Sequence, residues 1–229
     1  MIKGLLFDLD GVVIDSESYN DKSCADLLKE FNEEYDREFL KPRMVGKSDI
    51  EGMNLLVSHH NLPISGEEFD IRRKENKRRF YELEIPYMVG FEKFFEKLRK
   101  HFNCQVAIVT VCNKEYFDLI DKRLKISEKF NGNIFRSEMV KKHKPAPDVY
   151  IYAGEKLNID CKDCLVFEDS PSGIVSGLRA GARVVVLTTT FSKETIMDVV
   201  GDVVNFDDIL FIDGFDENSL KEVLRFSEG

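Results

Sequence analysis

The sequence predicts an α/β fold: a doubly wound, Rossmann-like parallel sheet with an inserted all-helical cap domain. Continuous apolar runs recur at wide intervals, and helical patterns separate them. Apolar runs without polar alternation are typical of strands buried on both faces, as in parallel sheets. A long segment with helical periodicity and no comparable strand follows the first run. Right-handed crossovers would give the doubly wound core, and the helical segment would form the cap.

The predicted strands are four apolar runs of the kind found in buried sheets. They are residues 4–7, 105–109, 164–167 and 183–187. Helical patterns occupy the intervals, at residues 91–101, 114–124, 148–157 and 172–180. Regular alternation of strand and helix indicates βαβ units rather than separate sheets and bundles.

The segment 16–87 indicates a second domain, because prolines punctuate its helical patterns and no strand-like run occurs in it. We therefore predict an α/β core formed by residues 1–15 and 88–229, and a helical cap domain formed by residues 16–87. Two linkers, near the two ends of the inserted segment, would join the domains.

Composition limits the possible partners. The 229 residues are 43% hydrophobic and 33% charged, a balance typical of a globular protein. A net charge of -9 argues against nucleic-acid binding, since the phosphate backbone attracts Lys and Arg. The first carboxylate, Asp8, comes too early for a signal peptide, and no stretch approaches the roughly 18 apolar residues of a spanning helix. We expect a cytoplasmic monomer that binds neither nucleic acid nor membrane.

The first predicted strand ends in paired carboxylates, Asp8 and Asp10, followed by Gly11. Residues two apart in an extended chain point the same way, so the two carboxylates converge while Leu9 turns into the packing. Adjacent carboxylates are costly unless a cation neutralises them, and an oxygen-only site suits Mg²⁺. Open α/β sheets bind ligands at the carboxyl ends of their strands, so we expect the functional site at this edge.

Residues 8–12, Asp-Leu-Asp-Gly-Val, resemble the signature of haloacid dehalogenase superfamily phosphatases, and residues 13–17 extend the resemblance toward the β-phosphoglucomutase-like subgroup. Thr110 is similar to the phosphate-binding Ser or Thr of that family, Lys144 to its lysine, and residues 167–173 to its acidic motif. Four motifs in this order make the resemblance specific for the predicted core. The predicted cap matches only in position and helical character.

The resemblance implies a Mg²⁺-dependent phosphatase that hydrolyses a small phosphomonoester, such as a sugar phosphate, through an aspartyl phosphate. Asp8 would be the nucleophile and a metal ligand. Asp10 would protonate the leaving oxygen and later take a proton from water, and its backbone carbonyl would also bind the metal. Asp169 would be a further ligand. Adjacent residues on a regular strand face opposite ways, so Glu168 would bind the metal together with Asp169 only where the strand ends. Otherwise it would contact the metal through a water molecule.

Thr110 and Lys144 are the candidate phosphate-binding residues, since a cation would hold the nucleophile and the phosphate together in an acidic site. Asn113 opens the next helix, where unpaired N–H groups attract an anion, but simple helix capping explains it equally well. Lys47 lies where the cap loop of the family often presents a substrate-facing residue, although a solvated lysine is as good an interpretation.

A β-phosphoglucomutase-type sugar-phosphate mutase is the main alternative, because it shares this chemistry and differs in the phosphoryl acceptor. Asn20 stands where the related mutases carry a histidine, and an asparagine cannot titrate, so we favour water as the acceptor. A receiver-like phosphoacceptor domain is a remote alternative, which the inserted segment and the aspartate pair on the first strand oppose. Dehalogenation is disfavoured, since a carbon–halogen bond needs no acid such as Asp10.

Overall fold

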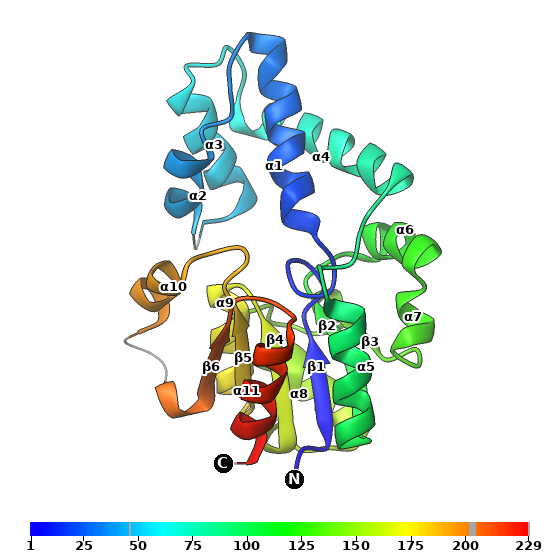
Figure 1. The fold of residues 1–229 in the computed structure, drawn as a ribbon. Coiled ribbons are helices and arrows are strands. Elements are labelled where there is room, and N and C mark those ends of the chain that lie inside the picture. The colour runs from blue at the N-terminus through cyan, green and yellow to red at the C-terminus, as the bar shows by residue number, and fades with distance from the viewer. Residues whose placement is uncertain (46, 202–204, 229) are drawn as a thin grey trace. The chain divides into compact units, whose positions relative to one another are not determined.

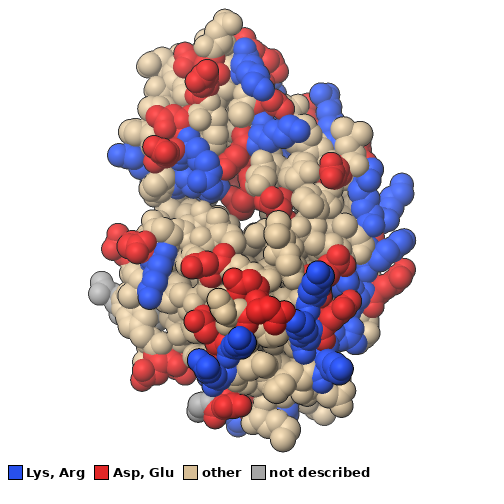
Figure 2. All heavy atoms as spheres, viewed as in Figure 1, with Lys and Arg blue, Asp and Glu red and all other residues tan. Residues whose placement is uncertain are grey.

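The computed structural model describes residues 1–45, 47–201 and 205–228. The chain forms two compact units, Met1–Asp15 with Pro86–Gly229 and Ser16–Ile85, which we call the core unit and the helical unit. Among the described residues, no helix is long and apolar enough to cross a membrane. On the face seen in Figure 2, acidic and basic side chains are interspersed over both units.

A parallel sheet, six-stranded within the described residues, forms the centre of the core unit (Figure 1). The strands are β1 Gly4–Phe7, β2 Gln105–Thr110, β3 Ile134–Arg136, β4 Cys164–Glu168, β5 Arg183–Leu187 and β6 Ile209–Ile212. Their order, β3-β2-β1-β4-β5-β6, means that the direction of winding reverses at β1. This topology confirms the predicted doubly wound fold. It also makes the carboxyl ends of β2, β1 and β4 neighbours, where such sheets bind ligands.

Helices cover both faces of the sheet. They are α5 Phe91–Phe102, α6 Lys114–Leu124, α7 Ile126–Lys129, α8 Asp148–Leu157, α9 Pro171–Arg179, α10 Lys193–Val200 and α11 Glu217–Glu228, with the short 3₁₀ turns η2 Ser137–Met139, η3 Cys161–Asp163 and η4 Phe206–Asp208. Figure 1 shows α5 and α11 in front of the sheet and α8 behind it. On β1, Phe7 meets the rings of Phe91, Phe95 and Phe130, whereas Leu6 joins the apolar cluster on the opposite face. Both faces are therefore buried, as the apolar runs predicted.

The four predicted strands agree with the observed ones to within one residue at each end, but β3 and β6 were not predicted. These two strands lie at the edges of the sheet and contain three and four residues. Three residues carry too little periodicity to separate β3 from a turn or a helix end. Length does not explain β6, because its apolar run Ile-Leu-Phe-Ile is as long as that of β1. An edge strand also pairs on one side only, so its pairing places fewer demands on its sequence.

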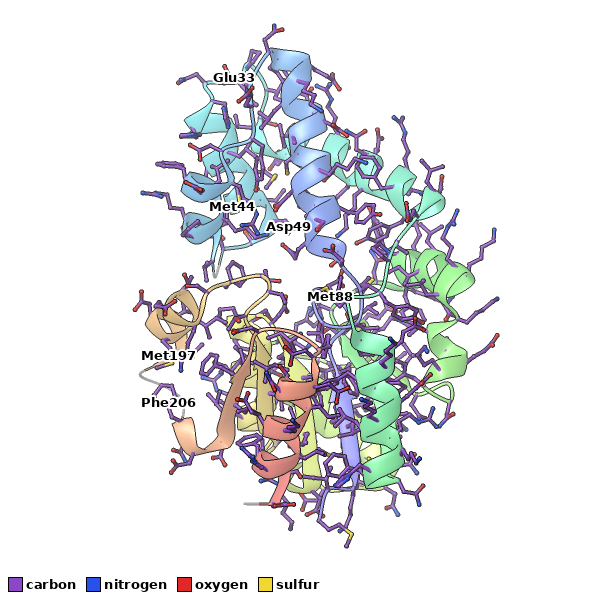
Figure 3. All side chains as sticks on the ribbon, in the orientation of Figure 1. Glu33, Met44, Asp49, Met88, Met197 and Phe206 are labelled. Atoms are coloured by element: carbon purple, nitrogen blue, oxygen red, sulfur yellow. The ribbon has the colours of Figure 1, made fainter. Side chains whose placement is uncertain are left out.

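The helical unit contains α1 Ser16–Leu28, α2 Arg37–Met44, α3 Asp49–His59 and α4 Gly66–Leu83, with the 3₁₀ turn η1 Lys29–Phe31. Ser48 and Ser65 cap α3 and α4 by accepting a hydrogen bond from the backbone N–H three residues on. Leu56 and Phe69 are fully buried in the apolar core between the helices, and Met44 packs against it (Figure 3). No strand occurs among the described residues of this unit, in keeping with the prediction.

Candidate active site

The candidate site residues of the core unit gather at the carboxyl ends of three neighbouring strands. Asp8 directly follows β1, Thr110 is the last residue of β2, Glu168 is the last residue of β4 and Asp169 follows it. Lys144 reaches the same edge from the segment before α8. The four strand-end residues are buried, and the side chain of Lys144 is only 3% exposed. Five polar residues from distant parts of the sequence thus share one buried site.

Lys144 lies at the centre of this group. Its Nζ is 2.6 Å from Asp8 Oδ1 and 2.6 Å from Glu168 Oε1, and it donates to the backbone oxygen of Val109 at 2.9 Å. Removing charged groups from water is costly, so buried ions persist only where partners and hydrogen bonds surround them. The lysine therefore joins the ends of β1, β2 and β4 and fixes one oxygen of Asp8.

The site holds more negative than positive charge. Burial raises the pKa of Asp8 from 3.8 to about 7, although Lys144 acts in the opposite direction, and the negative charges of Glu168 and Asp10 add to the rise. Burial alone would lower the pKa of Lys144, but Asp8 and Glu168 raise it above its usual value. The lysine therefore stays charged, and one positive charge does not offset the surrounding carboxylates.

Glu168 already has protein donors on both oxygens. Oε1 accepts from Lys144 and from the hydroxyl of Tyr150 at 2.8 Å, and Oε2 accepts from Ser170 Oγ at 3.1 Å. The start of α9 leaves room for this carboxylate, because a Cβ at Gly173 would lie 1.9 Å from Oε1. A metal ion bound directly to Glu168 would compete with these donors. The contacts that Glu168 makes in the structure are those of a residue that positions Lys144.

Asp169 completes a group of three carboxylates. Asp8, Glu168 and Asp169 each present an oxygen, and these oxygens lie within 4.8 Å of one another. Because β4 ends at Glu168, Asp169 lies outside the strand, and its side chain need not point to the opposite face from that of Glu168. Its Oδ2 accepts a hydrogen bond from Thr190 Oγ1. Gly11, with a φ of +75°, lies so close that a Cβ there would be 2.0 Å from this oxygen.

The chemistry of this donor set fits Mg²⁺. The three carboxylates offer oxygen ligands only, which Mg²⁺ prefers, and their charge exceeds that of the one lysine among them. Burial is the main cause of the raised pKa of Asp8, the neighbouring carboxylates add to it, and a bound divalent cation would lower it. Asp8 and Asp169 are the side chains best placed to hold the ion, with Glu168 beside them.

Thr110 and Asn113 both make local hydrogen bonds next to the site. Thr110 Oγ1 accepts from the backbone N–H of Cys112 at 2.9 Å, so its own proton can be donated elsewhere. Asn113 Oδ1 accepts from the backbone N–H of Tyr116 at 3.0 Å and thereby caps α6. Of the two interpretations of Asn113, helix capping is the one seen in its side-chain contacts, and phosphate binding stays a prediction.

The remaining candidate residues lie outside the carboxylate group. Asp10 is partly exposed and is not one of the three clustered carboxylates, whereas Leu9 between the two aspartates is fully buried, as predicted. Lys47 is exposed and lies between α2 and α3 of the helical unit. In α1 of that unit, Asn20 Nδ2 donates to Glu17 Oε1 at 2.9 Å.

Two residues of the site, Tyr150 and Thr190, were not predicted. Tyr150 follows Lys144 by six residues and is fully buried on α8. Burial raises its pKa well above the usual value, so the hydroxyl stays protonated and can donate to Glu168. A buried tyrosine hydroxyl needs a partner, but the sequence does not say which one. Thr190 comes three residues after β5, so the rule that polar strand ends gather at one edge could have found it.

Residues 5–187 match the haloacid dehalogenase-like hydrolase family. The match spans well over half of the chain and includes the whole helical unit. It also includes the four residues at the ends of β1, β2 and β4, which are Asp8, Thr110, Glu168 and Asp169. The chain therefore belongs to this family. The result confirms the resemblance that the motifs after the strands indicated. Of the site residues described above, Thr190 alone lies beyond the matched segment.

Curated relatives and solved structures agree with this assignment. A bifunctional riboflavin kinase/FMN phosphatase from Arabidopsis thaliana is 27% identical over 88% of this chain, which spans only 52% of that relative. A phosphorylated carbohydrates phosphatase from Thermotoga maritima is 28% identical over 79% of this chain and 82% of its own length. A conserved haloacid dehalogenase-like protein of unknown function from Agrobacterium tumefaciens has a TM-score of 0.80 at 19% identity over 100% of both chains, which shows a shared fold.

Proposed function

We propose that this chain is a Mg²⁺-dependent phosphatase that hydrolyses a small phosphomonoester, such as a sugar phosphate, through an aspartyl phosphate. The family and the phosphatases among its relatives support action on a phosphorylated metabolite. The observation that carries the proposal is the buried Asp8 at the end of β1, held 2.6 Å from Lys144 beside the carboxylates of Glu168 and Asp169. Phosphoryl transfer needs this combination of a fixed nucleophile and concentrated cation-binding groups.

Asp8 is the proposed nucleophile. One of its oxygens attacks phosphorus, and the bond between phosphorus and the leaving oxygen breaks, which gives an aspartyl phosphate. The hydrogen bond from Lys144 to Oδ1 restricts rotation of the carboxylate, and such positioning is a large part of phosphoryl-transfer catalysis. Bound Mg²⁺, held by Asp8 and Asp169, would neutralise charge between the carboxylates and the phosphoryl oxygens.

Asp10 is the proposed general acid and base. It follows Asp8 by two residues, is partly exposed and lies outside the carboxylate group, so it can exchange protons with a leaving group or with water. In the first step it gives a proton to the leaving oxygen, and in the second it takes one from the water that attacks the aspartyl phosphate. The buried Thr110 hydroxyl at the end of β2 would donate to a phosphoryl oxygen.

Water is the proposed acceptor, rather than the hydroxyl of a second sugar phosphate. Asn20 supports this choice, because its amide cannot titrate and its Nδ2 is engaged with Glu17. The test incubates the protein with β-glucose 1-phosphate, Mg²⁺ and a trace of glucose 1,6-bisphosphate, and follows glucose 6-phosphate and free phosphate together. Phosphate release supports hydrolysis. Rapid formation of glucose 6-phosphate with little phosphate release would establish the mutase instead.

A panel of small phosphomonoesters tests the proposed function itself. Phosphate release should occur on a subset of the panel with Mg²⁺ and should stop in excess chelator, because the buried carboxylates and the substrate phosphate otherwise repel one another. An Asp8→Asn variant purified in parallel controls for contaminating phosphatases. Turnover that persists in chelator, or equal turnover by the variant, would overturn the proposal.

A further inference from the structure

Thr190 donates a hydrogen bond to Asp169, one of the proposed metal ligands. It lies in the loop after β5, is only 9% exposed, and donates its hydroxyl proton to Asp169 Oδ2. Asp169 itself is 5% exposed, so this hydrogen bond is buried on both sides. Nothing in the motifs at the ends of β1, β2 and β4 contains this threonine.

The backbone after β1 encloses the same carboxylate oxygen. A Cβ at Gly11 would lie 2.0 Å from Asp169 Oδ2 and 2.9 Å from Thr190 Oγ1, so both groups pack directly on the glycine. Thr189 ties the two loops together, because its hydroxyl donates to the backbone oxygen of Gly11 at 3.2 Å. The loop after β5 therefore attaches to the loop that carries the proposed nucleophile.

An aspartate without such contacts would not keep one orientation. The terminal torsion of its side chain is broad, so the carboxylate rotates easily about the Cβ–Cγ bond. Mg²⁺ demands near-octahedral geometry, and a ligand that must be ordered on binding lowers the affinity. Hydrogen bonds to ligating side chains counter this loss by fixing them before the ion arrives.

We propose that Thr190 is a positioning residue that orients Asp169 for the divalent cation and thereby sets the affinity of the site for Mg²⁺. This inference rests on the proposed metal-dependent function. It differs from a purely structural role in one respect: loss of the hydroxyl weakens Mg²⁺ binding by the folded protein, whether or not it also lowers stability.

Calorimetric titration of the metal-free protein with Mg²⁺ tests the inference without any assay of activity. Thr190→Val removes the hydroxyl and keeps the branched shape, and we expect it to weaken Mg²⁺ binding by about 10- to 100-fold. Thr190→Ser keeps the hydroxyl and should bind nearly as the wild type does. Thr188→Val is the matched control, because the Thr188 hydroxyl in the same loop contacts Asp213 Oδ1, at 2.7 Å, and Ile212 O.

Each outcome decides between the alternatives. Unchanged Mg²⁺ affinity in Thr190→Val, or an equal loss in Thr188→Val, would overturn the inference and leave the proposed function intact. Absence of Mg²⁺ binding by the wild-type protein would overturn both. Thermal unfolding without metal shows whether each variant is folded. If Thr190→Val does not fold, Thr190→Ala replaces it in the same titration.

Discussion

Each unit contains a cluster of charged side chains, and the two clusters differ in their balance of charge. In the core unit, the buried carboxylates of Asp8, Glu168 and Asp169 share one ammonium group, that of Lys144. Burial raises the pKa of Asp8 to about 7, because the single positive charge does not offset it. The negative charge of this cluster is not neutralised without a further cation or a proton.

The cluster of the helical unit is balanced. Buried Asp70 pairs with buried Arg73 at 2.7 Å, and Lys74 and Asp49, at the start of α3 (Figure 3), bring the group to two acids and two bases. Although desolvation favours the neutral acid, Arg73 and Lys74 lower the pKa of Asp49. Asp70 and Arg73 are buried like the carboxylates of the core unit, whereas the side chain of Asp49 is 61% exposed. The pKa of Asp49 is lowered by its two basic neighbours, and that of Asp8 is raised by burial that one lysine does not offset. The excess of buried carboxylates in the core unit supports the proposed cation site, whereas the balanced group of the helical unit needs no further ion.

The largest expected effect is that of Asp8→Asn, which should abolish turnover because an amide is not a nucleophile. The fold should persist, since asparagine has the same shape and burying a neutral amide costs less than burying a carboxylate. Phosphate release and circular dichroism check the two halves of this prediction. Asp49→Asn makes the same change in the balanced cluster and should retain turnover. Equal losses in both variants would remove the functional distinction between the clusters.

Asp10→Asn should slow turnover by about 10²- to 10⁴-fold on substrates with alkoxide leaving groups, because the acid that protonates them is lost. The slowing of the first step should be smaller on p-nitrophenyl phosphate, whose leaving group needs no proton. Pre-steady-state release of nitrophenol measures that step directly. A defect of the same size on both kinds of substrate would contradict the role of Asp10 as an acid.

Stability of the metal-free protein should depend on pH through Asp8. Its pKa is raised from 3.8 to about 7, so the folded state keeps a proton that the unfolded chain loses as pH rises between these values. The contribution is fully present below pH 3.8 and is lost by about pH 7, at most about 4 kcal/mol. Urea unfolding of wild type and Asp8→Asn across this range isolates the effect, and Mg²⁺ should restore stability near neutrality. A pH-independent difference between the two proteins would argue against a raised pKa of Asp8.

Arg73→Met should destabilise the helical unit by about 3 kcal/mol, because it leaves Asp70 buried without its main partner. The double variant Asp70→Leu, Arg73→Met should recover much of this loss, since apolar side chains of similar volume replace a buried ion pair well. Urea unfolding followed by circular dichroism measures both. Mg²⁺ affinity should stay unchanged in the folded single variant, and weaker Mg²⁺ binding would contradict the separation of the two clusters.

The strands that carry the site could be predicted because their signal is local. Residues 4–7 and 164–167 are unbroken apolar runs, and Asp8 and Glu168 are the first polar residues that follow them, with Asp169 next to Glu168. Parallel strands put their carboxyl ends at one edge, so residues far apart in sequence could be grouped before any contact was known. The three-residue edge strand β3 carries no comparable signal, whereas β6 is an apolar run as long as β1 and could have been predicted in the same way.

The supporting contacts could not be predicted, because they depend on how helices and loops pack. Tyr150 reaches Glu168 because α8 packs against the sheet, and its sequence position suggests only a buried aromatic residue. Likewise, a serine or threonine after a strand is usually a turn residue, and only the close approach of Gly11 brings Thr190 onto Asp169. The sequence therefore indicates the candidate reactive side chains, whereas the packing of helices and loops determines which residues hydrogen-bond to them.

Lys144 has a further consequence for how the site treats its substrate. An ammonium group has three N–H bonds, and those of Lys144 are taken by Asp8, Glu168 and Val109. An arriving phosphate must displace one of these partners, and exchange of one hydrogen bond for another yields little free energy. In the proposed aspartyl phosphate, Asp8 would no longer be a carboxylate, because its negative charge leaves with the alkoxide that Asp10 protonates. The hydrogen bond from Lys144 to Asp8 would then weaken, and the ammonium group could donate to a phosphoryl oxygen instead. In the proposed mechanism Lys144 would therefore stabilise the reacting state more than the bound substrate, and its loss should lower kcat more than it raises KM.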